Sequence, residues 1–394
     1  MDIRTLKDIP EIKGKRIIVR VDYNVPLQKD GEIQDDTRIV ESLDTIKYLL
    51  EKGGRLIIVS HLGRPDGQYK EEFRLTRVAQ YLGKLLNQNV KKFDLVLNDQ
   101  IKSEIDGMQD SEIVMLENVR FHPGEESCDP KFTKELAGIG DIFVSDAFGA
   151  AHRKHASTAG IAQYLPAYAG LLMEKEIKAL SPLMEDEPKR PLTMIFGGAK
   201  IDTKIDVIKN FLEKADYFLI GGGLANTFLS AKGYNVGKSL YEAEKSELAN
   251  EIMEKAENFI LPHDVVVAEE ISETAKAENI SIEKVENEMK ILDIGMESAE
   301  KFAKIVHDSG TIIWNGPLGL YEFTPFQNGS RTVAKALAAN KNATSIIGGG
   351  DTIDSIKRFN ISPDQFTHVS TGGGACIEFL AGKSLPGIEI FKSS

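Results

Sequence analysis

Short β-branched runs alternate with helical patterns along this whole sequence, and five of the runs in the second half end in glycines. Alternating strands and helices predict a parallel α/β fold. Glycine lets the backbone lie close to a ligand, and a helix that starts after it points free N–H groups and its positive dipole end at that ligand. The glycine turns therefore predict an anion-binding rim along one edge of a sheet. They lie at residues 197–198, 221–223, 316, 348–350 and 372–374.

The predicted strands are short and rich in β-branched residues, as is typical of parallel strands buried on both faces. In the first half they lie at residues 16–21, 55–60, 112–116 and 141–144. In the second half they lie at residues 192–196, 217–220, 264–268, 311–314, 345–347 and 368–369. Helical patterns separate them, for example at residues 42–51 and 75–86.

A chain of 394 residues is too long for one ordinary core, so we expect two domains. Apolar residues recur at helical spacing over residues 171–187, and Pro188 and Pro191 then end the pattern. This helix is a natural connector between two α/β domains. The predicted fold is α/β, with two doubly wound parallel-sheet domains joined by a hinge helix. The predicted limits are 1–170, 171–187 for the helix, and 188–377.

The composition narrows the possible partners. The formal net charge of −12 argues against nucleic acid and anionic membranes as partners. An anionic substrate would need a local basic pocket, and most of the arginines lie at or before Arg153. The two cysteines, Cys128 and Cys376, lack metal-site spacing, and the N-terminus has no apolar signal core. We therefore expect a cytoplasmic protein with reduced thiols.

Polar and basic residues follow the predicted strands of the first half. Arginine's planar fork suits carboxylates and phosphates, and four arginines at strand ends and helix starts are hard to explain as solvated surface. Asp and Asn after the first strand are, taken alone, better explained as turn formers. For His61 beside Arg64, structural and ligand-binding interpretations are about equally supported. The candidate residues of this half are Asp22, Asn24, Arg38, His61, Arg64, Arg120 and Arg153.

In the second half, Lys200 and Lys204 are expected on one face of a helix start, where the helix dipole would repel them unless they bind phosphates. A solvated helix face is the alternative. Asp351 and Thr352 follow a glycine triplet, so they either cap a helix or bind Mg²⁺ with phosphate oxygens. Glu322 is an acid among apolar neighbours that either accepts ribose hydroxyls or is an ordinary exposed residue.

Two nucleotide motifs are incomplete. Residues 233–239 resemble a Walker A loop but are one residue short and follow a helical pattern rather than a strand. The glycines at 221 and 223 begin a dinucleotide fingerprint, but Asn226 stands where its last glycine should be. The incomplete fingerprint therefore argues against a nicotinamide dehydrogenase. The presence of Lys204, Arg38 and Asp351 argues against an inactive nucleotide-binding module.

Eight motifs occur in family order from end to end, and through them the chain resembles the phosphoglycerate kinases. They are Arg20-Val-Asp22-Tyr-Asn24-Val-Pro26, Ser60-His61-Leu-Gly-Arg64-Pro65, Leu116-Glu-Asn118-Val-Arg120-Phe-His122, Asp146-Ala-Phe-Gly-Ala-Ala-His152-Arg153, Gly197-Gly-Ala-Lys200-Ile-Asp-Thr-Lys204, Trp314-Asn315-Gly-Pro317, Gly348-Gly-Gly-Asp351-Thr352 and Ser370-Thr371-Gly-Gly-Gly-Ala375.

The resemblance implies two Rossmann-like domains and reversible transfer of a phosphoryl group between 1,3-bisphosphoglycerate and ADP, giving 3-phosphoglycerate and ATP with Mg²⁺. It implies that the N-terminal domain binds phosphoglycerate, that the C-terminal domain binds nucleotide, and that residues 378–394 return to the first domain. It also implies a monomer. The implied phosphoglycerate ligands are the seven candidates of the first half.

By the same resemblance, Asp351 is the metal ligand, and the catalytic residues are Arg38, Lys204, Gly372, Gly373 and Gly374. The implied nucleotide-binding residues are Gly197, Gly198, Lys200, Lys204, Gly221, Gly222, Asn315, Glu322, Gly349, Gly350, Asp351 and Thr352.

Overall fold

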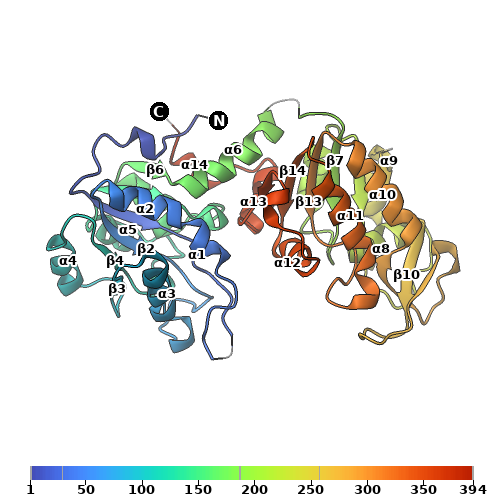
Figure 1. Ribbon diagram of the computed structural model, residues 1–394, viewed down its shortest axis with the longest axis horizontal. Coiled ribbons are helices and arrows are strands. Elements are labelled where there is room, and N and C mark those ends of the chain that lie inside the picture. The colour runs from blue at the N-terminus through green and yellow to red at the C-terminus, as the bar shows by residue number, and fades with distance from the viewer. Residues whose placement is uncertain (1, 29, 186–187, 257, 393–394) are drawn as a thin grey trace. The chain divides into compact units, whose positions relative to one another are not determined.

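The computed structural model describes residues 2–28, 30–185, 188–256 and 258–392. It divides into two compact units, Met1–Lys178 with Ser384–Ser394, and Ala179–Lys383. Figure 1 shows the first unit mainly in blue and cyan, with the red helix α14 (Pro386–Glu389), the last helix in the sequence, packed into it. The domain limits predicted above stay predictions, and residues 186–187 of the predicted connector lie outside the described part.

The first unit is built on a six-stranded parallel sheet of order β3-β4-β2-β1-β5-β6. Its strands are β1 (Arg16–Arg20), β2 (Arg55–Val59), β3 (Lys91–Lys92), β4 (Ile113–Met115), β5 (Ile142–Ser145) and β6 (Ala167–Ala169). The strand order changes direction at β1, which pairs with β2 on one side and β5 on the other. Ligands of open α/β sheets bind beyond the carboxyl ends of the strands at such a point.

The helices of the first unit cover the sheet (Figure 1). They are α1 (Thr37–Glu41), α2 (Leu43–Glu51), α3 (Thr76–Leu86), α4 (Asp99–Asp106) and α5 (Pro130–Ala137). Of these, α2, α3, α4 and α5 each have buried apolar residues. Ile17, Ile18 and Val19 of β1 are all fully buried although they alternate between the two faces of the sheet. Burial on both faces explains why β1 has a continuous apolar run.

The second unit contains another six-stranded parallel sheet, of order β15-β14-β13-β7-β8-β9. Its strands are β7 (Leu192–Phe196), β8 (Tyr217–Ile220), β9 (Phe259–Ile260), β13 (Thr311–Asn315), β14 (Thr344–Gly348) and β15 (His368–Val369). The order changes direction between β7 and β13, which are hydrogen-bonded neighbours. The two parallel sheets confirm the predicted fold class.

The helices of the second unit follow its strands and pack around this sheet. They are α7 (Ile205–Phe211), α8 (Gly222–Ala231), α9 (Ser246–Lys255), α10 (Met296–Asp308), α11 (Asn328–Ala339), α12 (Gly350–Arg358) and α13 (Gly374–Leu380). The core beneath α10, α11 and α12 contains the fully buried Trp314, whose Nε1 donates to the carbonyl of Gly316 at 2.7 Å. This hydrogen bond anchors the turn that follows β13.

All predicted strands were expected in parallel sheets, and one of them lies in an antiparallel sheet instead. β10 (Asp264–Ala268) belongs to a separate three-stranded sheet, in which it pairs antiparallel with β11 (Glu278–Ser281) and β12 (Lys290–Ile294). β11 is partly exposed and polar, so it lacks the apolar run by which a strand is recognised. The edge strands β3, β6 and β9 are only two or three residues long and were also not predicted.

Helix α6 spans Leu171–Glu185 and contains Pro182. The division between the two units falls inside it, between Lys178 and Ala179. The Asp146 carboxylate accepts the free N–H groups of Leu172 and Met173 at 2.9 and 3.1 Å, which satisfies two of the donors that a helix start leaves unpaired. Within the described ranges, every helix is too short or too polar to cross a bilayer.

Candidate active site

Asp22 and Arg38 form an ion pair beyond the carboxyl end of β1. Arg38 is the second residue of α1, which begins at Thr37. Its Nη1 donates to Oδ2 of Asp22 at 2.6 Å, and the Asp22 side chain is only 10% exposed. An arginine held by a buried carboxylate has a defined direction, so it is ready to meet an anion without first losing side-chain freedom.

His61 lies beside this pair, directly after β2 and its neighbour Ser60. The ring is buried, and its Nδ1 is 3.1 Å from Nη2 of Arg20, the last residue of β1. Burial lowers the pKa of His61 well below its usual range, and Arg20, Arg120, Arg153 and Arg38 lower it further. The imidazole is therefore neutral at physiological pH.

The turn at Gly63 is held from both sides by residues of the predicted site. Oδ1 of Asn24 accepts the Gly63 N–H at 2.9 Å, and Nη1 of Arg120 donates to the Gly63 carbonyl at 2.7 Å. Asn24 and Arg120 are therefore structural partners of the loop that carries His61 and Arg64. Burial lowers the pKa of Arg120 to about 10, although the nearby Glu126 opposes the shift.

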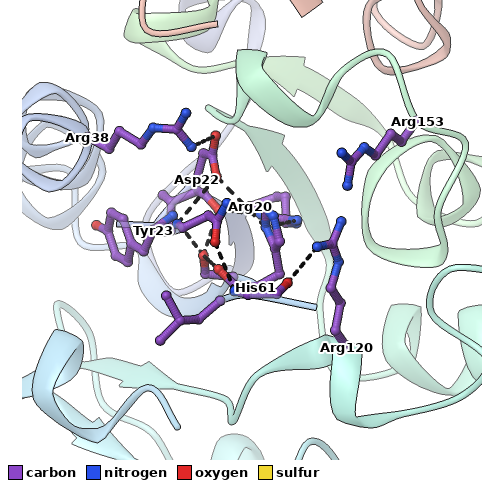
Figure 2. Close-up of polar contacts among 12 residues, drawn as sticks. Arg20, Asp22, Tyr23, Arg38, His61, Arg120 and Arg153 are labelled. Carbon is purple, nitrogen blue, oxygen red and sulfur yellow. Dashed lines mark hydrogen bonds and ion pairs between the residues drawn. The ribbon is translucent and has the colours of Figure 1, made fainter. Parts of the chain in front are cut away.

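Arg153 completes the basic pocket, by which we mean the surroundings of Asp22, His61, Arg38, Arg120 and Arg153. Figure 2 shows Arg38, Arg120 and Arg153 extending from different elements toward Asp22 and His61. Arg153 is half-buried, and its Nε is 3.0 Å from Nε2 of His152. Arg64 is exposed and makes no hydrogen bond or ion pair with any described residue. It is thus the arginine with the most freedom to bind a ligand.

In the second unit, three of the predicted glycine turns meet at the point where the strand order changes. A Cβ on Gly197 would lie 2.0 Å from the carbonyl oxygen of Pro317, so no larger residue fits between the ends of β7 and β13. The N–H of Gly198 donates to the Pro317 carbonyl at 2.9 Å, and that of Gly222 donates to the Leu318 carbonyl at 2.8 Å. Gly221 lies at the N-cap of α8 in the same cluster.

A cavity of about 560 Å³ opens beside these turns. Its volume is in the range of small-molecule and cofactor sites. Much of its wall is apolar, including Leu240, Val265, Leu292 and Leu318, while Lys238, Glu322 and Asp351 supply charge. Glu322 is exposed, as an acid at the rim would be. We call this space the glycine cavity.

The two lysines are not on one helix face, so this expectation is wrong. Helix α7 begins at Ile205, with Lys204 at its N-cap, and residues 201–204 form turns. The N–H of Ile201 donates to the Glu242 carboxylate at 2.5 Å, which gives this segment a partner outside the helix. Lys200 is exposed, whereas Lys204 is half-buried. Burial lowers the pKa of Lys204, and Asp351 opposes the shift, so these two residues lie within electrostatic reach.

Helix α12 begins at Gly350, and its N-cap is Gly349, whose φ of 94° favours glycine. Asp351 is the second residue of α12 and is exposed; because the N-cap is Gly349, Asp351 does not cap the helix. Thr352 is fully buried, and its Oγ1 accepts the Gly316 N–H at 2.7 Å. Thr352 therefore joins α12 to the turn after β13. Nδ2 of the buried Asn315 has no hydrogen-bond partner among the described residues and lies near Gly349.

The last glycine turn leads into α13. Gly373 has a φ of 51° and is the N-cap, and the N–H of Gly372 donates to Oγ of Ser370 at 3.1 Å. Cβ atoms built on Gly373 and Gly374 would meet nothing within 4 Å, so this turn is open rather than packed. Packing within the unit does not explain these two glycines, whereas close approach of a ligand would.

The donor set around Asp351 fits Mg²⁺ only if phosphate oxygens share the ion. Mg²⁺ is commonly bound by one or two carboxylates together with substrate phosphates and water. Within the described ranges, no three His, Cys, Asp or Glu residues converge as a metal site. Asp351 at the edge of the glycine cavity would supply the protein's carboxylate.

Two buried ionisable residues near the site had no role assigned from the sequence. Arg20 is 1% exposed in the basic pocket, and Asp293 is 2% exposed in the wall of the glycine cavity. Each occurs within an apolar strand, β1 or β12. Both residues could have been recognised from the sequence, because a charged residue within an apolar strand pattern is expected to be buried and to need a partner.

An arginine-lined pocket on one parallel sheet and glycine turns around a cavity on another are features of an α/β phosphotransferase with two anionic ligands. The family model described as phosphoglycerate kinase matches residues 6–383. A phosphoglycerate kinase of Dictyoglomus turgidum is 49% identical over 395 residues, which cover 99% of each chain.

Two solved structures are also similar. Phosphoglycerate kinase from Coxiella burnetii has 42% identity and a TM-score of 0.88, with 99% of this chain and 98% of that chain covered. The enzyme from Pyrococcus horikoshii has 34% identity and a TM-score of 0.86, with 98% of each chain covered. The chain belongs to the phosphoglycerate kinase family. It is a kinase of glycolysis whose acceptor is a carboxyl group.

Proposed function

We propose that this chain transfers a phosphoryl group reversibly between 1,3-bisphosphoglycerate and ADP, with Mg²⁺, through the residues described above. The observation that carries the assignment is the convergence of Arg38, Arg120 and Arg153 on Asp22 and His61 in one unit. An anionic ligand is the natural occupant of such a pocket, because it relieves the mutual repulsion of the guanidinium groups.

In the basic pocket, the phosphoglycerate is bound by Asp22, Asn24, Arg38, His61, Arg64, Arg120 and Arg153. Arginines and the His61 ring take the phosphate and carboxylate. Asp22 repels those groups, so its role toward the ligand is to accept the substrate hydroxyl while it orients Arg38. Asn24 and Arg120 act partly through the Gly63 turn that they hold.

In the second unit, the nucleotide occupies the glycine cavity, with Gly197, Gly198, Gly221, Gly222, Asn315 and Glu322 around it. Lys200, Lys204, Gly349, Gly350, Asp351 and Thr352 lie toward its phosphates. The open turn Gly372–Gly373–Gly374 and Lys204 stabilise the moving phosphoryl group together with Arg38. When bound, Mg²⁺ supplies charge neutralisation between the nucleotide phosphates and Asp351.

The chemistry needs no general base in the direction of ATP use. The nucleophile is the carboxylate of 3-phosphoglycerate, and a carboxyl group with a pKa near 4 is ionised at neutral pH. The protein therefore contributes positioning and preorganised positive charge. Because the two ligands are assigned to different units, transfer also requires the units to bring them together. We propose a cytoplasmic monomer with neither nucleic acid nor membrane as a partner, in keeping with the net charge of −12.

A coupled assay of ATP formation from 1,3-bisphosphoglycerate and MgADP tests this function. Activity that requires both substrates and Mg²⁺ is expected. A chain that binds ADP but forms no ATP would contradict the proposal. The Arg38→Ala variant is the matched control, since it should fold and bind nucleotide but lose turnover.

A further inference from the structure

Arg20 and His61 form a buried pair, and their contact determines which nitrogen of the His61 ring carries the proton. Nη2 of Arg20 is 3.1 Å from Nδ1 of His61 (Figure 2). A guanidinium group has donors and no acceptor, so Nδ1 must be the acceptor and cannot carry a proton. A neutral imidazole carries its one proton on the other nitrogen, Nε2.

The rival partner for the same nitrogen is Asp22. A carboxylate within hydrogen-bond distance would draw a proton to Nδ1, but Oδ1 of Asp22 is 3.8 Å away, beyond the range of a hydrogen bond. A second proton on the ring is also disfavoured. Burial, Arg20 and the three arginines of the basic pocket all keep the pKa of His61 low.

Arg20 is itself held in one orientation by its other donors. Its Nε donates to Oγ of Ser157 at 3.0 Å, and its Nη1 donates to the carbonyl of Val21. Ser157 in turn donates from Oγ at 2.6 Å and from its backbone N–H at 3.0 Å to the fully buried Glu125. The charge of Arg20 is therefore balanced by Glu125 through one hydroxyl group, and its third donor faces His61.

We propose that Arg20 is a positioning residue that holds His61 as the neutral tautomer with its proton on Nε2, so that the ring offers one N–H donor to the anionic substrate. The proposal rests on the assignment of His61 as a ligand of 3-phosphoglycerate. The opposite tautomer would offer a lone pair, which repels a phosphate or carboxylate oxygen. Arg20 would thus determine whether His61 attracts or repels the anionic substrate, without itself contacting the substrate.

Nitrogen NMR of the full-length protein labelled with ¹⁵N-histidine measures the tautomer directly and needs no substrate. The His61 signals are identified by their loss in His61→Gln. The expected result at pH 7 is a pyridine-type signal for Nδ1 and a pyrrole-type signal for Nε2. A proton on Nδ1, or protons on both nitrogens, would overturn the proposal. Because no substrate is present, this failure is distinct from failure of the enzyme to form ATP.

A second experiment tests whether Arg20 is the reason that His61 adopts this tautomer. Arg20→Met removes the donor, and Arg16→Met is the control, since Arg16 starts the same strand and pairs with Asp106 and Asp141 instead. Arg20→Met should give mixed tautomers and bind 3-phosphoglycerate about tenfold more weakly, the lower end of the effect of losing an imidazole's orienting partner at metal sites. ADP binding by the second unit should be unchanged in both variants, and cooperative urea unfolding like that of the wild type reports that the first unit is folded. An unchanged tautomer or an unchanged 3-phosphoglycerate affinity in folded Arg20→Met would overturn the proposal. If Arg20→Met does not fold, the wild-type spectrum still decides the tautomer.

Discussion

Nη1 of Arg38 lies 2.6 Å from Oδ2 of Asp22, and this pair sits beyond the carboxyl end of the strand at which the first sheet changes direction. The pair explains how an arginine that is 31% exposed on a five-residue helix can have a defined position. An arginine so placed can bind the resting substrate or stabilise charge in the transition state, and kinetics distinguish these two roles.

Arg38→Ala should lower kcat by roughly 10²–10³-fold with modest changes in KM, the size expected when a preorganised group that stabilises transition-state charge is lost. Steady-state kinetics in both directions measure this. Arg77→Ala is the control, because Arg77 pairs with Glu32 at an exposed site. A near-normal kcat in Arg38→Ala would remove this residue from the mechanism.

Arg64→Ala and Arg120→Ala should both raise the KM for 3-phosphoglycerate far more than that for ATP, with a loss of roughly 1.5–3 kcal/mol for one charge-assisted contact. Their stabilities should differ. Arg120→Ala leaves the Gly63 carbonyl without its donor and should lower the free energy of unfolding by about 1–3 kcal/mol, whereas the exposed Arg64 should have little effect. Steady-state kinetics measure the two KM values, calorimetric titration measures 3-phosphoglycerate binding, and urea unfolding measures the stability of each variant. Wild-type binding of 3-phosphoglycerate by both variants would argue against the basic pocket as its site.

Asp351→Asn should weaken the Mg²⁺ dependence of activity and leave metal-free ADP binding largely intact. The reason is that Asp351 is exposed at the glycine cavity and is not the N-cap of α12. Asp354→Asn is the matched control on the same helix, since Asp354 pairs with Arg358. A titration of activity with Mg²⁺ measures the effect, and curves that superimpose for wild type and Asp351→Asn would exclude a metal-binding role.

Asp293 should make the protein less stable as the pH rises toward 8. Burial raises the pKa of Asp293 to about 8, although the N–H groups of Gly329 and Ile294 donate to it. Between its unfolded pKa near 4 and this value, the folded state binds more protons than the unfolded state. The free energy of unfolding should therefore fall by up to about 1.4 kcal/mol per pH unit from pH 6 to pH 8.

Urea unfolding measured at several pH values from 6 to 8 tests this prediction. The quantity compared between variants is the slope of the free energy of unfolding against pH. Asp293→Asn cannot titrate and should remove this part of the slope, whereas Asp364→Asn, at an exposed position, should keep the wild-type slope. Equal slopes in wild type and Asp293→Asn would mean that Asp293 is already ionised in the folded state at pH 6.

Much of the fold could be predicted because its signals are local. The limits of β7 and β8 agree with the prediction, since a buried parallel strand is a continuous apolar run ended by turn residues. The same local rule located the glycines and arginines at strand ends. It failed at Lys200 and Lys204, where the backbone turns before α7 begins. At β10 it predicted the limits of the strand but not its antiparallel partners β11 and β12, which have a weaker pattern.

The sequence by itself determined which residue types follow each strand, because turn chemistry and strand burial act over a few residues. Only the tertiary structure decided which of those strand ends are neighbours. β7 and β13 pair although more than 100 residues separate them, and this pairing brings Gly197 against Pro317. It likewise decided that Asp22 holds Arg38 and that Arg20 faces His61. Such pairings depend on strand order and on packing across the whole sheet, for which no stretch of sequence carries a local signal.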